Sequence, residues 1–470
     1  MSDISTLLFD QLTPVSLYGE LKTLFEDEIT MLFESVVNTN EGNFSFIVIG
    51  AKERIIHKDN TSTHIDENGM ISSIAKNPFD FMKEYYAKID KKHFEQRAHD
   101  AGFSFTDGFI GFIGYDLVKV FEPTLCASMD NLQDDLGTPD LDLIRPKIII
   151  GYSHKNSTLT IIQNDTSMTQ AVESIKKLLL KPHSPYPLQR PKLEKEGALH
   201  IGKEEFEQII EESKEHIRSG DIFQILISNR YTQQGEIDAL SFYRLLRSKN
   251  PSPYLFLLEY ETFSICGSSP EVMVRLTDNE ILLRPIAGTR KRGDTRTRDK
   301  ELEIEMINDP KECAEHLMLI DLGRNDVGRV AQIGSVKVTE MMRVERYSHV
   351  MHMVTDIEAQ LEKGKDMFDL FVATFTAGTM TGAPKIKAME LIAKFEKLKR
   401  GFYSGSVGYF AFDGNMDSAI TIRTSLIQKD KITLQAGAGV VADSKPELEY
   451  LEVNNKLGAL IATLKELEEV

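Results

Sequence analysis

The chain lacks most of the features that mark secreted, membrane and zinc-finger proteins. Its 470 residues include three cysteines, Cys126, Cys266 and Cys313, which form no CxxC pair and no disulfide framework. No stretch approaches the roughly 18 uncharged apolar residues that a membrane helix needs. The first residues lack the basic flank and apolar core of a secretory signal. We therefore expect a cytoplasmic protein that does not bind membranes.

Positive charge is also outnumbered, with 55 Lys and Arg residues against 72 Asp and Glu residues. The formal net charge is −17, and a surface of this kind repels nucleic acid and anionic lipid. One stretch, RPIAGTRKRGDTRTR, is basic and contains a single acid, Asp294. It is either a local pocket for an anionic substrate or a solvated loop, and the charge cluster alone favours the loop.

Enzyme motifs that are easily recognised are missing as well. GAGVVA, residues 437–442, matches a dinucleotide fingerprint, but too little chain follows it for a βαβ unit. GTMTGAPK, residues 378–385, lacks the ending and spacing of a phosphate loop. The sequence contains no GxSxG and no HExxH motif. These absences exclude the common nucleotide-binding, serine hydrolase and zinc protease sites.

The pattern of elements predicts an α+β fold. A proline-rich linker at 181–198 separates residues 1–180 from residues 199–470. The stretches 405–412, 419–428 and 432–441 resemble an antiparallel meander, and a helix is expected from Lys203. We expect large antiparallel β-sheets packed as a sandwich, with helices on the outer faces.

Two predicted helix starts carry paired carboxylates. Asp309-Pro310-Lys311-Glu312 precedes Glu315, and the predicted capping box Ser444-Lys445-Pro446-Glu447 precedes Glu449 and Glu452. The last helix has a predicted buried stripe of leucines, which comprises Leu448, Leu451, Leu457, Leu460 and Leu464. Four such carboxylates suit Mg²⁺, although Glu-x-x-Glu is more often a solvated helix face.

Three further features are open to two interpretations. His352 lies in a predicted strand, where histidines are more often packed than catalytic. Arg423 shares a predicted strand face with Thr421 and Ser425, and either grips a carboxylate or forms an internal salt bridge. Gly437 and Gly439 allow close approach to a ligand, or only mark a bulge.

Taken together, these segments resemble the chorismate-utilising enzymes, and among them the anthranilate synthase component I branch. The matching runs lie in the family's order between about residues 200 and 462: NPSPYLF, GSSPE, RPIAGTR, DPKECAEHLMLIDLGRND, VERYSHVMH, AGTMTGAPK, GFYSGSVGY, FDGNMDSAITIRT, QAGAG and EYLEVNNK. Residues 1–180 match more loosely, through TPVSLY and MLFESV. One departure is Thr376, where the family usually has proline. The resemblance implies an N-terminal regulatory region at 1–180 and a chorismate-binding catalytic domain at 199–470.

The resemblance also implies roles for the candidate residues. Glu315 and Glu452 would bind Mg²⁺, with Glu312 and Glu449 beside them, and the metal would hold the ring carboxylate of chorismate. The other residues expected around the substrate are Gly288 and Thr289 at the ring, Lys456 near the metal-bound end, and Arg423, Tyr403, Gly437 and Gly439 at the enolpyruvyl carboxylate. His352 would serve in acid–base chemistry.

Two positions distinguish this chain from related branches. Salicylate and isochorismate synthases carry a water-activating lysine where this chain has Gln224, and aminodeoxychorismate synthases commonly carry an attacking lysine where it has Ala287. We therefore expect ammonia to attack, giving anthranilate and pyruvate through aminodeoxyisochorismate. The chain has no glutaminase nucleophile motif, so a partner amidotransferase subunit would supply the ammonia, and a heterotetramer is expected. The alternatives are an aminodeoxychorismate synthase component I and a non-catalytic tryptophan-binding relative.

The resemblance finally implies feedback inhibition by tryptophan. Glu34 and Ser35 would meet Asn250, Pro251 and Tyr254 in one tryptophan-binding pocket. The Glu34 carboxylate would face the amino group of tryptophan, and the segment Asn250 to Tyr254 would form a wall for its indole ring. A basic residue that the family carries shortly after the Glu-Ser pair has no counterpart between residues 38 and 46. The alternative interpretation is a surface acid and a plain turn before a strand.

Overall fold

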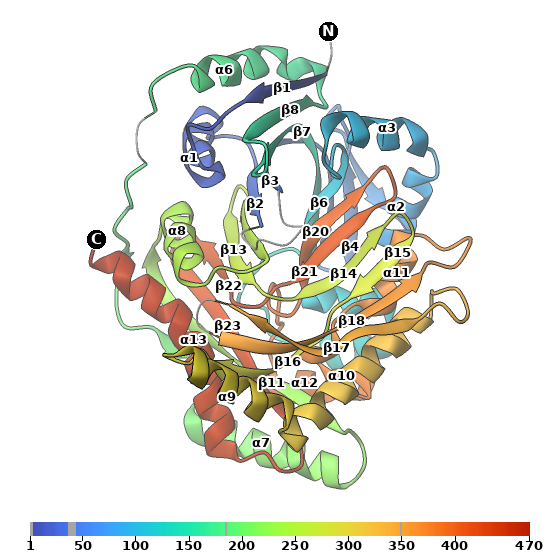
Figure 1. Ribbon diagram of the computed structural model, residues 1–470, viewed down its shortest axis with the longest axis vertical. Helices are drawn as coiled ribbons and strands as arrows, with labels where there is room; N and C mark the ends of the chain where they lie inside the picture. Colours follow the sequence, from blue (N-terminus) through green and yellow to red (C-terminus); the bar gives the residue numbers. More distant parts are fainter. Residues whose placement is uncertain (1–2, 36–43, 184–185, 348–349) are drawn as a thin grey trace.

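The structure is a computed structural model of the chain, and it describes residues 3–35, 44–183, 186–347 and 350–470. Among these residues every pairing between named strands is antiparallel, as the sequence predicts for an α+β fold with large sheets. The strands form two layers that share the long strands β3 (Phe44–Lys58) and β7 (Leu141–Ser153) (Figure 1).

The first layer runs outward from β7 and β3 in both directions. Its remaining strands are β1 (Ile4–Leu8), β8 (Thr158–Gln163), β2 (Thr30–Glu34), β12 (Tyr254–Glu259), β13 (Phe263–Ser269), β22 (Thr424–Gln428), β23 (Lys431–Val440) and β11 (Gln224–Glu236). The short strands β9 (Lys192–Leu193), β10 (Ala198–Leu199) and β19 (Gly382–Ala383) pair with β11.

The second layer begins at the N-terminal end of β7, where Leu141 to Ile144 pair with β6. It comprises β6 (Gly108–Ile113), β20 (Ser406–Ala411), β21 (Met416–Ile420), β14 (Val272–Thr277), β15 (Glu280–Leu283), β18 (Val350–Gln360), β16 (Ile286–Lys291) and β17 (Lys337–Arg346). The strands β4 (Thr61–Ile65) and β5 (Ile71–Ile74) extend the far end of β3.

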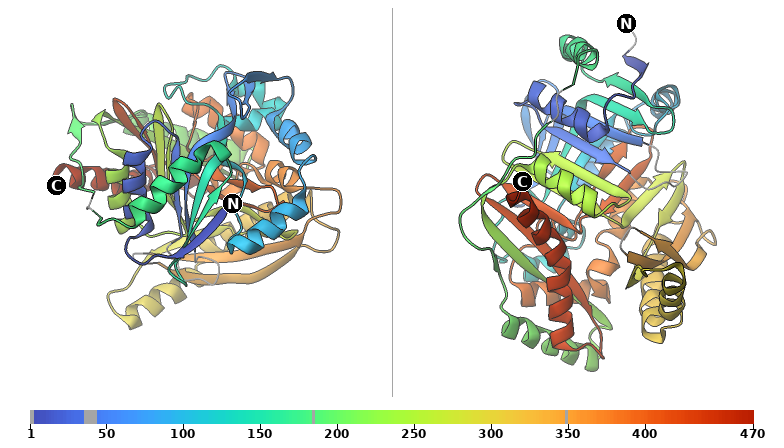
Figure 2. Two further views of the ribbon diagram at one scale, coloured as in Figure 1. Left: turned by 90° about the horizontal axis from the view of Figure 1, so that it is seen from above. Right: turned by 60° about the vertical axis from the view of Figure 1, so that its left-hand side comes forward.

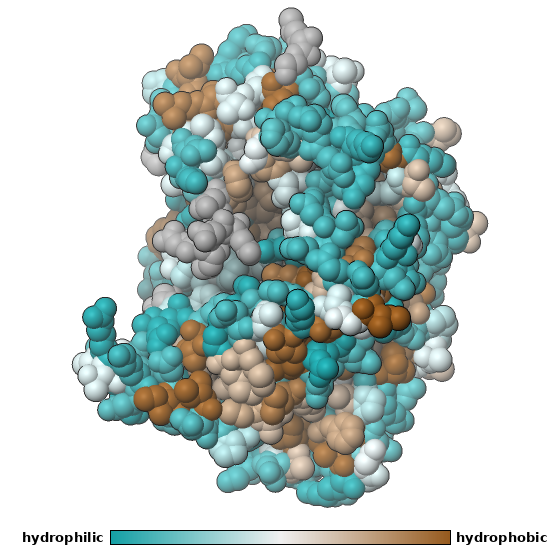
Figure 3. All heavy atoms as spheres, turned by 45° about the vertical axis from the view of Figure 1, so that its right-hand side comes forward, coloured by the Kyte–Doolittle hydropathy of each residue, from teal (hydrophilic) through white to brown (hydrophobic). Residues whose placement is uncertain are grey.

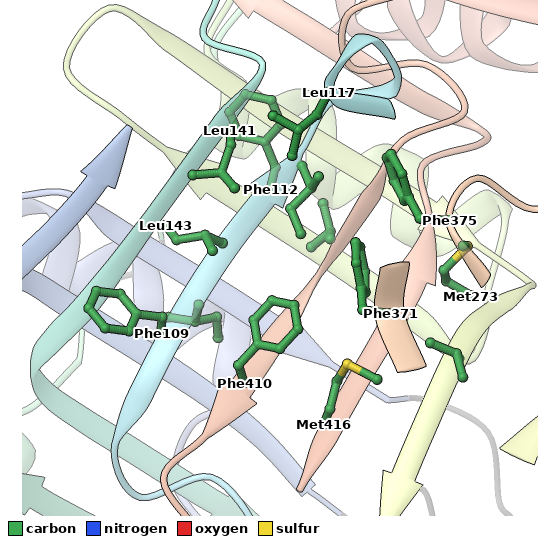
Figure 4. Close-up of a cluster of buried hydrophobic side chains, with 14 of the residues drawn as sticks. Phe109, Phe112, Leu117, Leu141, Leu143, Met273, Phe371, Phe375, Phe410 and Met416 are labelled. Carbon is green, nitrogen blue, oxygen red and sulfur yellow. The ribbon is translucent and has the colours of Figure 1, made fainter. Parts of the chain in front are cut away.

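The two layers pack face to face as a sandwich. The ring of Phe46 in β3 lies 6.1 Å from that of Tyr409 in β20, and the ring of Phe112 in β6 lies 5.7 Å from that of Phe263 in β13. Figure 4 shows the neighbouring core, where Phe109, Phe371 and Phe410 gather at the second layer. Burial of such side chains is the main driving force for this packing.

Helices cover the outer faces. On the first layer lie α1 (Pro14–Leu24), α6 (Thr169–Leu179), α7 (Lys203–Arg218), α8 (Ala239–Lys249) and α13 (Pro446–Glu468), with α12 (Lys385–Glu396) beside β11. On the second layer lie α2 (Pro78–Tyr86), α3 (Lys91–Ala101), α9 (Arg296–Ile307), α10 (Pro310–Gly328) and α11 (Met367–Thr374); α4 (Val118–Phe121) and α5 (Cys126–Met129) are short. No helix in the described residues is long and apolar enough to cross a membrane. In Figure 3 hydrophilic side chains cover most of the upper part of the face shown, and hydrophobic ones gather in its lower half.

Strands pair across the predicted linker at 181–198. In the first layer Glu34 of β2 lies opposite Leu255 of β12, and in the second layer β6 pairs along its length with β20. The predicted boundary therefore separates two stretches of sequence whose strands are hydrogen-bonded into the same layers.

The predicted strand at 419–428 is wrong, because it is two strands. β21 ends at Ile420 in the second layer, and β22 begins at Thr424 in the first. Arg423 lies in the break with φ 49°, so it does not share a strand face with Thr421 and Ser425. The chain must leave one layer and enter the other here, which a continuous strand cannot do.

A second crossover lies beside the first. β13 ends at Ser269 in the first layer and β14 begins at Val272 in the second, so Glu271 lies between them. The Ile420 amide donates to the Glu271 carbonyl at 3.0 Å, and the Ser268 amide donates to the Arg423 carbonyl at 3.2 Å. These bonds hold the two crossovers together between the layers.

The last helix also differs from its prediction. Lys445 is the N-cap of α13, and the predicted capping box does not form. Leu448 and Leu451 are 57% and 54% exposed, whereas Leu457, Leu460 and Leu464 are buried as predicted. The reason is that Glu449, which is 7% exposed, occupies the inward face of the first turn.

Candidate functional site

Glu271 and Arg423 form the centre of the candidate site. Glu271 is 6% exposed, and the Thr379 hydroxyl donates to its Oε1 at 2.9 Å. Burial raises the pKa of Glu271 to about 8, although the positive charges of Arg423 and Lys456 oppose the rise. Burial lowers the pKa of Arg423, and among the described residues its guanidinium has no hydrogen-bond or ion-pair partner. A neutral acid therefore lies near a cation whose donors are available.

His352 faces the same region from β18. Its Nδ1 lies 3.1 Å from the Gly288 carbonyl and 3.1 Å from the Thr289 hydroxyl, both in β16. The carbonyl bond requires a proton on Nδ1, so Nε2 is an acceptor, and among the described residues this buried atom has no partner. Burial, followed by the charge of Arg423, lowers the pKa of His352 to about 4. The imidazole is therefore a neutral base at physiological pH.

The four predicted carboxylates come from two helices on opposite sides of the lower part of the molecule (Figure 2, right). Burial raises the pKa of Glu315, and the charges of Glu312 and Glu452 raise it further. Burial and then the charge of Glu452 raise the pKa of Glu449. Acids from α10 and α13 therefore repel one another across a shared space, which is the condition that a cation relieves.

Each pair also has protein partners. The Arg290 guanidinium donates to Glu312 at 2.8 Å, and the Gln224 amide donates to Glu315 at 3.4 Å. Lys456 forms a 2.8 Å ion pair with Glu452. Within the described ranges no group of three or more His, Cys, Asp or Glu side chains is already arranged to hold a metal ion. The donor set, all carboxylate oxygens, nevertheless matches the chemistry that Mg²⁺ prefers.

A glycine-bearing strand, β23, forms the wall between these groups. The Lys456 ammonium donates to the Gly437 carbonyl at 2.8 Å. A Cβ at Gly437 would lie 3.0 Å from the Tyr403 hydroxyl, and one at Gly439 would lie 2.7 Å from the Gln224 amide nitrogen. Both glycines therefore allow other side chains of this chain to pack closely against β23, and their contact with a ligand stays a prediction.

The basic stretch at 284–298 does not form a free anion pocket. Arg290 contacts Glu305, Asp309 and Glu312, and Arg292 forks onto Asp299. Acids of α9 and α10 therefore neutralise much of its charge, and the expected solvated loop is instead β16 followed by the start of α9. A separate cavity of about 590 Å³ is lined by no candidate site residue.

The two segments expected to bind tryptophan do meet. Glu34 lies opposite Leu255, directly after Tyr254, in the β2–β12 ladder. The Glu34 carboxylate, however, accepts hydrogen bonds from Tyr243 at 2.7 Å and from Arg247 at 2.7 Å. The stretch 36–43, where the sequence offers no basic residue, lies outside the described residues, and Arg247 of α8 supplies a cation from a different element.

Sequence reasoning missed Glu271 and Arg247. Glu271 belongs to the GSSPE run, which the sequence marks only through its resemblance to the chorismate-utilising enzymes. The raised pKa of Glu271 arises from burial by segments that are distant in the sequence. A carboxyl that follows Ser-Pro at the end of an apolar strand is the one local signal that was available. Arg247 lies on an ordinary charged helix face, where nothing in the sequence marks it.

Comparison with known proteins gives one consistent result. A family model described as chorismate binding enzyme matches residues 30–462. The chain is 39% identical over 479 residues to anthranilate synthase component 1 of Aquifex aeolicus, covering 98% of this chain and 94% of the relative, and 40% identical to that of Acinetobacter calcoaceticus, covering 97% and 94%. The crystal structure of anthranilate synthase component I from Streptococcus pneumoniae matches with a TM-score of 0.77 at 32% identity, over 91% of this chain and 94% of that one.

Proposed function

We propose how this chain, which belongs to the chorismate-binding enzyme family and within it to the anthranilate synthase component I proteins, carries out the conversion of chorismate to anthranilate in tryptophan biosynthesis. Chorismate carries two carboxylates, so an acidic chain needs two separate cationic groups to receive it. The arrangement of the site supplies one at each end. The observation that supports this assignment most strongly is the neighbourhood of Arg423 and Glu271 between the layers.

Glu315 and Glu452 would hold Mg²⁺ at the carboxylate end, with Glu312 and Glu449 beside them. The mutual repulsion of these acids favours a divalent cation there. When bound, the metal supplies positive charge that holds the ring carboxylate. Gln224 orients Glu315 through its amide, and Lys456 holds Glu452.

The enolpyruvyl carboxylate binds at the other end. Among the described residues the Arg423 guanidinium has no hydrogen-bond partner, so its donors serve this carboxylate, and we assign Tyr403 and the backbone near Gly439 to it as further contacts. Thr289 and the Gly288 carbonyl orient His352 at the ring. This positioning fixes which ring carbon faces the incoming ammonia.

Two groups with opposite pKa shifts handle the protons. Glu271 is held as a neutral acid, so it donates a proton as the 4-hydroxyl departs as water while ammonia attacks C2. His352 is held as a neutral base, so its Nε2 accepts the C2 proton when pyruvate leaves. Overall, chorismate and ammonia give anthranilate, pyruvate and water.

The identity of the nucleophile follows from two side chains. Gln224 is not a base that activates water, and Ala287 has no amine to attack the ring. Ammonia therefore reacts, and a component II amidotransferase subunit delivers it from glutamine, in a heterotetramer. The three cysteines are unpaired, which fits a reducing cytoplasm.

Tryptophan binds where β2 meets α8 and β12 and acts as a feedback inhibitor. Glu34, Ser35 and the segment Asn250 to Tyr254 line this place, and Arg247, whose side chain is 28% exposed, supplies a cation beside the buried Glu34 carboxylate. Because this place is separate from the chorismate site, inhibition requires that tryptophan bind one conformational state more tightly than another.

Product analysis of the purified chain tests the proposal. Chorismate, Mg²⁺ and an ammonium salt at mildly alkaline pH should give fluorescent anthranilate and equal pyruvate, and chelator should abolish both. Glutamine should not replace ammonium in the absence of the partner subunit. Aminodeoxychorismate without pyruvate would support the aminodeoxychorismate synthase alternative, and tryptophan binding without any product would support the non-catalytic one.

A further inference from the structure

A small cavity of about 30 Å³ lies behind Glu271, within the second layer and its covering helices. Glu271, Thr379 and Asp326 line it, together with Arg284, and the remaining wall is largely apolar. A cavity needs roughly 10–15 Å³ and polar partners to hold one water molecule, so this one accommodates about two. Nothing in the acid–base scheme uses this space.

The far side of the cavity leads to a buried ion pair. Asp326 of α10 is 5% exposed and accepts a 2.7 Å hydrogen bond from the ammonium of Lys385, the first residue of α12. The Lys385 side chain is 14% exposed. Asp326 lines the cavity and Lys385 is partly exposed, so this ion pair connects the cavity with solvent.

The proposed reaction requires Glu271 to be recharged. In each turnover its carboxyl proton leaves on the departing 4-hydroxyl as the C4–O bond breaks and the C2–N bond forms. The resulting carboxylate is buried, and Thr379 donates to one of its oxygens. The cavity behind Glu271 offers a proton a route that does not pass through the space assigned to the substrate.

We propose that water in this cavity returns a proton to Glu271 in each turnover, relayed from Lys385 through Asp326. The inference rests on the proposed role of Glu271 as the acid. The Lys385 ammonium gives a proton to Asp326, a cavity water carries it to the Glu271 carboxylate, and Lys385 regains a proton from solvent. The net change is one proton taken from solvent to Glu271, with Lys385 and Asp326 back in their starting states, and no redox partner is needed. Asp326 and Lys385 are relay residues that never contact the substrate.

Rapid-mixing kinetics of Asp326→Asn with chorismate, Mg²⁺ and ammonium test the relay. Glu271 already carries its proton at the start, so the first turnover should proceed at the parent rate. Later turnovers should be at least about tenfold slower, giving a burst of about one product per site. Asp321→Asn is the matched control, because Asp321 is on the same helix with a side chain 74% exposed. An unchanged steady-state rate in Asp326→Asn would overturn the relay.

A second variant leaves the ion pair intact. Ala377 lines the cavity, and Ala377→Val adds two methyl groups to its wall. Ala377→Val should show the same burst of one product per site followed by slow turnover. If Asp326→Asn does not fold, this variant alone tests the relay. A steady-state rate equal to that of the parent would contradict the relay. Glu271→Gln separates this inference from its premise. Loss of the first turnover in that variant supports Glu271 as the acid, and a normal first turnover rejects the acid itself.

Discussion

Replacing Glu271 with glutamine should stabilise the protein while it destroys activity. The pKa of the buried carboxyl is about 8 in the folded state, against an ordinary value of 4.5. The folded state therefore binds this proton more tightly than the unfolded chain does. The resulting stabilisation is complete below pH 4.5 and is lost as the pH rises from there to about 8. Glutamine has nearly the same shape as glutamic acid and does not titrate, so the variant does not lose stability as the pH rises.

The magnitude follows from the two pKa values. At pH 7 the solution is 2.5 units above the ordinary value of 4.5, and each unit corresponds to roughly 1.4 kcal/mol, so Glu271→Gln should gain about 3 kcal/mol. At pH 5 the gain should be below about 1 kcal/mol. Because Glu271 is 6% exposed, solvent screening reduces this figure little.

Urea unfolding of both proteins at several pH values measures this difference. The gap should widen between pH 5 and 8 and then level off, and anthranilate formation should fall by about 10²–10⁴-fold in the variant. Glu447→Gln, which replaces an exposed carboxyl on α13, should change neither property. A gap that is constant with pH would refute the reasoning, since it would mean that Glu271 is ionised in the folded protein.

Three other predictions concern separate parts of the molecule. Glu315→Gln should weaken Mg²⁺ binding at least about tenfold in calorimetry, because it removes one carboxylate ligand; unchanged binding would exclude it from the metal site. Arg400→Met should lower the free energy of unfolding by roughly 3–5 kcal/mol, since it strands the buried Glu396 that Arg400 contacts at 2.6 Å; a loss below 1 kcal/mol would show that the pair is dispensable. Arg247→Gln should weaken tryptophan inhibition and spare uninhibited turnover, because Glu34 loses its cation; unaltered inhibition would place the pocket elsewhere.

Local signals predicted the parts of the site that lie on single elements. Asp309 caps α10 by accepting from the Lys311 and Glu312 amides, so the pair that includes Glu315 could be placed on a helix start from sequence alone. The helix from Lys203 is confirmed as α7, and the predicted strand at 432–441 as β23. For the two helices, neighbours within one or two turns carry the signal, and for β23 the signal is its run of alternating and apolar residues.

Features that depend on distant segments could not be predicted. Arg423 leaves its strand because β21 and β22 belong to different layers, and no property of residues 419–428 reveals which layers those are. The neutrality of Glu271 depends on burial between the layers, with Thr379, Arg423 and Lys456 as its polar surroundings. Sequence analysis therefore identified Arg423 as a candidate, gave it the wrong backbone conformation, and overlooked the acid beside it.

A crystal structure of Glu271→Gln with Mg²⁺ and chorismate tests the central claim most directly, because this variant should bind the substrate without turning it over. We expect the enolpyruvyl carboxylate on the Arg423 guanidinium and the ring carboxylate on a metal held by Glu315 and Glu452. The ring should then lie with C2 toward His352 and the 4-hydroxyl toward residue 271. A substrate bound in the reverse direction, or a metal held by other residues, would contradict the account.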